Sequence, residues 1–144
     1  MPFSGDTVPS ARLILCHKQK TSARLRFLLF PHGVLAFEPL PLQAVICAGC
    51  SHTRVMLHPA AWAHQACERL GMPHDAISPE PEFHVEAHCN GDIVTILLAT
   101  FTSIDPPFEM ARMHDARFAP ITDMRQLPRA ELDVLGHVYE YLIG

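Results

Sequence analysis

The chain has 144 residues, of which 49% are hydrophobic and 18% charged, and this composition is typical of one folded domain and excludes a disordered tail or linker. Its 15 acidic and 11 basic residues give a formal charge of −4 with histidine neutral, which argues against a nucleic-acid-binding face. No apolar run approaches the roughly 20 residues that cross a bilayer, so we expect no membrane segment.

The N-terminus and the cysteines indicate the expected compartment. Residues 1–10 lack the basic and apolar regions of a secretory signal, and they predict a flexible arm ahead of a single domain over residues 11–144. The chain has an odd number of cysteines, five, spread through apolar segments: Cys16, Cys47, Cys50, Cys67 and Cys89. We therefore expect reduced thiols in a cytoplasmic protein.

The first third of the chain predicts short strands separated by polar or proline-containing connections. Apolar and alternating patterns favour strands over residues 11–17, 23–30, 34–38 and 43–48. Pro39 and Pro41 separate the last two, because proline cannot donate to a central strand ladder.

The periodicity changes to that of a helix over residues 59–70. Small and apolar side chains recur at i, i+3, i+4 and i+7, on Ala63, Ala66, Cys67 and Leu70. Pro59 suits a first helical turn, and Gly71 is typical of a helix end. His64 and Glu68 are four residues apart, so they share a face away from the apolar stripe.

The rest of the chain predicts a hairpin and a final helix. Strands over residues 83–89 and 92–102 flank Asn90-Gly91, a type I′ turn pair. A polar loop over residues 105–116, a short strand over 116–119 and a helix opening at Pro128 follow. This order of elements predicts an α/β domain, a mixed sheet with helices packed on it.

Two groups of residues could bind a metal. Cys47-Ala48-Gly49-Cys50 is a C-x-x-C pair that could hold zinc with His84 and His88, or act as a redox dithiol. The alternative is that both cysteines are buried and inert. His84-x-Glu86-x-His88 places two imidazoles and a carboxylate on one strand face, a set that zinc or iron accepts. The alternative for this row is the solvated face of a half-buried strand.

Two longer segments resemble the Nudix hydrolase family. Residues 58–72 (HPAAWAHQACERLGM) resemble its helix, and residues 113–124 (MHDARFAPITDM) resemble a late segment of the family. The hairpin at Asn90-Gly91 and the closing helix after Leu127-Pro128 fall where the family has them, so the resemblance covers residues 10–144. It implies an α/β/α sandwich that hydrolyses a nucleoside diphosphate linked to another moiety, with Mg²⁺ or Mn²⁺ as cofactor.

The resemblance fails where the family concentrates its acids. Aligning the family box, G-x5-E-x7-R-E-U-x-E-E-x-G-U, on Gly71 and Met72 places its R-E pair on His64-Gln65 and its E-E pair on Glu68-Arg69. Between Glu38 and Asp75 the only carboxylate is Glu68. If the protein is an enzyme, the resemblance implies Glu68 as catalytic residue and metal ligand. We expect help there from Glu86 as a metal ligand or Glu109 as a catalytic residue.

Three functions follow as expectations. The first is a Nudix-like hydrolase of a nucleotide or other pyrophosphate compound, with a degenerate and inactive or altered box. The second is a non-catalytic nucleotide-sensing or interaction domain on the same fold. The third is a zinc module built from Cys47, Cys50, His84 and His88. The N-terminal strands could also pair across a homodimer.

Overall fold

The computed structural model describes residues 11–22, 24–41, 43–48, 58–89 and 91–144, so the expected arm over residues 1–10 lies outside the described part. The elements follow in this order along the chain: β1 (Ala11–Lys18), β2 (Leu25–Leu29), β3 (Leu35–Ala36), β4 (Val45–Ala48), α1 (Pro59–Leu70), β5 (Ile77–Pro79), β6 (Val85–Cys89), β7 (Asp92–Phe101), α2 (Phe108–Met113), β8 (Arg117–Ala119), the 3₁₀ turn η1 (Ile121–Asp123) and α3 (Arg129–Leu142).

The eight strands form one mixed sheet, in which six follow the order β4-β6-β7-β1-β2-β8, while β3 pairs with β1 and β5 with β7. The two central strands, β1 and β7, run parallel from Ala11 opposite Thr95 to Cys16 opposite Thr100. Each central strand has two further partners along its other edge: β2 and β3 for β1, and β6 and β5 for β7. All of these further pairings are antiparallel, so β1 and β7 form the one parallel pair among the described strands.

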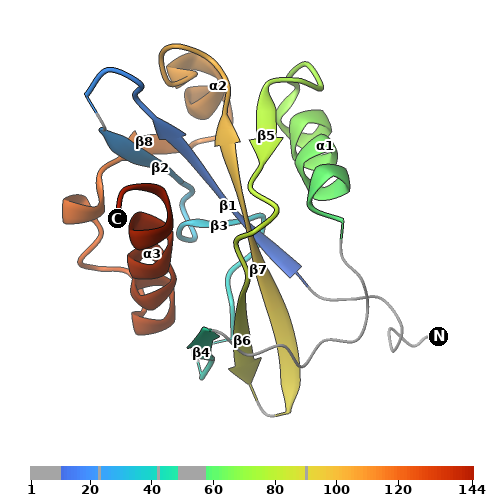
Figure 1. Ribbon diagram of the computed structural model, residues 1–144, viewed down its shortest axis with the longest axis vertical. Coiled ribbons are helices and arrows are strands. Elements are labelled where there is room, and N and C mark those ends of the chain that lie inside the picture. Colours follow the sequence, from blue (N-terminus) through green and yellow to red (C-terminus); the bar gives the residue numbers. More distant parts are fainter. Residues whose placement is uncertain (1–10, 23, 42, 49–57, 90) are drawn as a thin grey trace.

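Helices cover both faces of the sheet (Figure 1). On one face, Val134, Leu135 and Val138 of α3 pack against alternate side chains of β1, β2, β6 and β7. On the other, apolar side chains of α1 and Ala111 of α2 pack against the intervening residues. The alternation arises because successive residues of a strand point to opposite faces. The α/β class and the mixed sheet predicted from the sequence are therefore confirmed.

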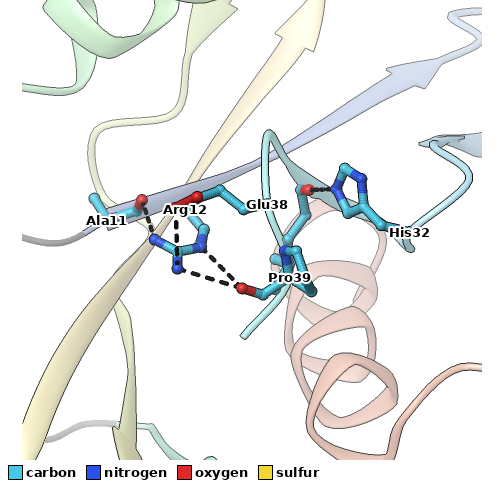
Figure 2. A network of polar contacts seen from close by, with 6 residues as sticks. Ala11, Arg12, His32, Glu38 and Pro39 are labelled. Carbon is cyan, nitrogen blue, oxygen red and sulfur yellow. Dashed lines mark hydrogen bonds and ion pairs between the residues drawn. The ribbon is translucent and has the colours of Figure 1, made fainter. Parts of the chain in front are cut away.

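Arg12 holds the segment after β3 against the start of β1 (Figure 2). Its guanidinium donates to the Pro39 carbonyl oxygen from Nε at 3.4 Å and from Nη2 at 3.3 Å. Nη2 also lies 3.5 Å from Glu38 Oε1, but Glu38 is largely exposed, so the backbone contact is the firmer one. The Arg69 guanidinium of α1 lies 4.0 Å from the centre of the Phe37 ring. The segment is thus held from β1 and from α1.

The strongest local patterns gave the correct elements. The helix over residues 59–70 is α1, and the predicted hairpin is β6 and β7, paired from Cys89 opposite Asp92. Two predictions of loop are wrong. The prolines of residues 73–81 predict a loop, but β5 lies there, and α2 lies within the loop predicted over residues 105–116. None of the described helices is long and apolar enough to cross a membrane.

Candidate functional site

Helix α1 presents its one carboxylate to solvent. Pro59 opens the helix, and Gly71 ends it in the left-handed conformation at φ 72°, with its N–H donating to the last turn. Ala63, Ala66, Cys67 and Leu70 are buried against the sheet, which turns Glu68 outward. No acidic residue lies in the first turn.

Two imidazoles lie beside Glu68. His74 Nε2 is 3.7 Å from Glu68 Oε2, and both side chains are more than half exposed, so this ion pair contributes little to stability. The His64 ring stacks on the His74 ring with their centres 4.6 Å apart. The solvent side of α1 therefore presents its carboxylate next to a pair of stacked imidazoles.

Strand β6 carries Glu86 and His88, and His84 directly precedes it, so the three residues form a row. Glu86 Oε2 lies 3.4 Å from His84 Nε2, and Glu86 Oε1 lies 3.2 Å from His88 Nε2. The three side chains share one face of the sheet, opposite Val85 and Ala87 of the core, as the sequence predicts.

The alternative of a solvated face is wrong for Glu86, whose side chain is fully buried while those of His84 and His88 are 43% and 36% exposed. Glu86 lies opposite Cys47 of β4 and Thr95 of β7, so strands flank it on both sides. A buried carboxylate requires charged or hydrogen-bonded neighbours, and the two imidazoles supply them.

Cys47 differs from the expected reduced thiol because it is disulfide-bonded. The expectation rested on the cellular compartment and not on the local geometry. A disulfide sulfur is not the thiolate that zinc requires, so in this form Cys47 does not complete a zinc site. Cys50 lies outside the described residues, whereas Cys16, Cys67 and Cys89 are free and buried.

Glu109 lies on a different element from the other expected carboxylates. It lies exposed in the first turn of α2, while Glu68 lies on α1 and Glu86 on β6. Across residues 11–22, 24–41, 43–48, 58–89 and 91–144, no group of three or more His, Cys, Asp or Glu side chains is placed to hold a metal ion. The described donors therefore do not fit a magnesium cluster.

A second buried carboxylate, Glu131, was not singled out by the sequence. It lies in the first turn of α3 and accepts a hydrogen bond from the Val34 N–H at 2.9 Å. Burial raises its pKa, and the hydrogen bond from Val34 and the nearby His32 only partly oppose that rise. Its position after Pro128 is typical of an exposed first-turn acid, so only the folded chain shows its role in holding the 31–34 turn.

The chain was also compared with known proteins. No family model matches it, and no curated protein sequence matches it.

Proposed function

We propose that the protein is a Nudix-like α/β/α domain that binds a nucleoside diphosphate compound without hydrolysing it through a magnesium cluster. The resemblance of residues 58–72 and 113–124 to the family, in the same order as its hairpin and closing helix, supports the ligand class. The placement of α1, α2 and α3 on the two faces of a mixed sheet is compatible with the sandwich that the family implies.

We infer the absence of hydrolysis from one observation, the single carboxylate of α1. Mg²⁺ prefers six oxygen ligands, and pyrophosphate hydrolysis by this family needs several carboxylates beside the substrate. From Pro39 to Cys67 the sequence has no Asp or Glu, so even the residues outside the described part add no acid there. Arg69 follows Glu68 and would repel a cation.

The test combines binding and turnover. Calorimetry with ADP-ribose and ATP, in the presence of Mg²⁺, should show binding, while chromatography of the same mixtures should show the ligands intact. Turnover that disappears in Glu68→Gln would contradict the proposal, because it would assign Glu68 a catalytic role.

A second candidate is a hydrolase with altered chemistry, and the His84–Glu86–His88 row favours it. A carboxylate beside an imidazole holds the ring in one orientation, which suits a general base that activates water. Turnover that survives Glu68→Gln, is lost in Glu86→Gln and is kept in Glu82→Gln would support this candidate over a binding domain. Glu82 is the matched control because it is exposed and lies just ahead of β6.

A further inference from the structure

The two parallel strands end at one pocket. β1 ends at Lys18 and β7 at Phe101, and a cavity of about 580 Å³ lies beside both ends. Figure 1 shows the arrowheads of β1 and β7 pointing the same way. Open α/β sheets bind ligands outside the carboxyl ends of parallel strands, and this volume is typical of small-molecule sites.

Both lysines of the whole chain line this pocket. The 144 residues contain only Lys18 and Lys20, and each is exposed at the end of β1. Lys18 Nζ donates to the Leu142 carbonyl oxygen at the end of α3, at 3.1 Å. Within the described part of the chain, neither lysine forms an ion pair with a carboxylate, so both ammonium groups can still meet an anion.

The pocket also offers an acceptor and hydroxyl groups. Glu80 lines it, together with Thr100 and Thr102. The Tyr141 hydroxyl donates to Glu80 Oε1 at 3.4 Å. Burial, followed by the charge of Glu80, raises the pKa of Tyr141. Two cations and one carboxylate suit a ligand with both anionic groups and hydrogen-bond donors.

We propose that this pocket binds the diphosphate of a nucleoside diphosphate compound, with Lys18 and Lys20 contacting the phosphates. Glu80 then accepts a hydrogen bond from a hydroxyl or amino group of the same ligand. The ligand class rests on the proposed function, but the location does not follow from it, since the family resemblance points to α1. Helix α1 has too few acidic side chains to bind a metal ion that would neutralise the phosphates. In this pocket the lysine ammonium groups supply the positive charge instead.

Calorimetry with ADP-ribose tests the location. Lys20→Glu should weaken binding about tenfold or more, and the double variant Lys18→Gln/Lys20→Glu should weaken it further, because charge-assisted contacts are lost. Arg125→Glu is the matched control: it makes the same change in net charge at an exposed residue outside the pocket and should leave the affinity nearly unchanged.

Lysine acetylation of the wild-type protein provides a second measurement. Because it uses no variant, a folding defect caused by a substitution cannot affect the result. With ADP-ribose present, mass spectrometry should show slower acetylation of Lys18 and Lys20 than in the ligand-free protein, with an added lysine-containing peptide as internal control. Binding with unchanged affinity in the lysine variants and no protection would overturn the location while leaving the proposed function standing. No binding of ADP-ribose or ATP by the wild-type protein would overturn both.

Discussion

At the scale of single residues, the buried carboxylate of Glu131 predicts a pH dependence of stability. Because its pKa in the folded protein is raised, its contribution to the free energy of unfolding is fully present below the ordinary value of 4.5 and is lost as the pH rises through the raised pKa. Glu131→Gln keeps an acceptor for the Val34 N–H but removes the ionisation. The variant should therefore gain stability relative to wild type between pH 4 and pH 7.

Urea denaturation at a series of pH values measures this difference. Glu140→Gln, exposed on the same helix, should show no comparable trend. A difference between Glu131→Gln and wild type that is flat across the range would contradict the account of Glu131.

Gly33 predicts a second residue-scale effect. Its φ is +136°, a conformation that side chains rarely adopt, and an added Cβ would collide with the Glu131 carboxylate. Gly33→Ala should lower the free energy of unfolding by about 2 kcal/mol or more. Gly136→Ala makes the same chemical change in α3, where the Cβ meets open space, and should raise it by about 0.5 to 1 kcal/mol. Denaturation curves measure the free energy of unfolding of both variants. Equal changes in the two variants would show that the inferred collision at Gly33 is wrong.

The same scale shows what sequence can predict about the candidate site. Period-2 geometry correctly placed His84, Glu86 and His88 on one face, because that depends only on neighbours along a strand. The flanking of Glu86 by β4 requires it to pair with Cys47, which lies far away in the sequence, whereas β7 is its partner in the local hairpin. Local pattern therefore identified the row but not the buried state of its carboxylate.

At the scale of elements, the composition of α1 predicts that Mg²⁺ does not raise the thermal stability of the protein. With one exposed carboxylate, the helix offers too few oxygen ligands, so millimolar Mg²⁺ should shift the thermal midpoint by less than about 1 °C. The double variant Gln65→Glu/Arg69→Glu introduces acids at two exposed positions of α1 and should acquire a Mg²⁺-dependent rise of the thermal midpoint. Differential scanning fluorimetry with and without chelator measures both. A clear Mg²⁺-dependent rise in the wild-type protein would contradict this view of α1.

The missed elements share a physical cause. α2 has only six residues and is held by Ala111 in the core and by a contact between the Phe108 and Phe118 rings, 5.8 Å apart. β5 has three residues and contains Pro79, and its extended form comes from pairing with the end of β7. Elements this short are determined by tertiary packing, whereas α1 spans three turns and has its own start and stop residues.

At the scale of the whole molecule, the parallel pairing of β1 with β7 joins segments about 80 residues apart, and nothing in either strand specifies its partner. The class and the mixed sheet could be predicted from the kinds of element, but the strand order could not. Lys18 and Lys20 illustrate the consequence. In the sequence they belong to an exposed polar connection, and only the pairing brings them to the end of β7 and to Glu80.

The measurement that tests the central claim most directly is phosphorus NMR of ADP-ribose mixed with the protein and Mg²⁺. It reports binding and hydrolysis in the same sample. We expect the diphosphate resonances to broaden or shift as the ligand binds, and then to persist unchanged in area, because α1 lacks the carboxylates for a magnesium cluster. Conversion of these resonances into phosphate monoester signals, at a rate that follows the protein concentration, would contradict the claim that this domain binds without hydrolysing.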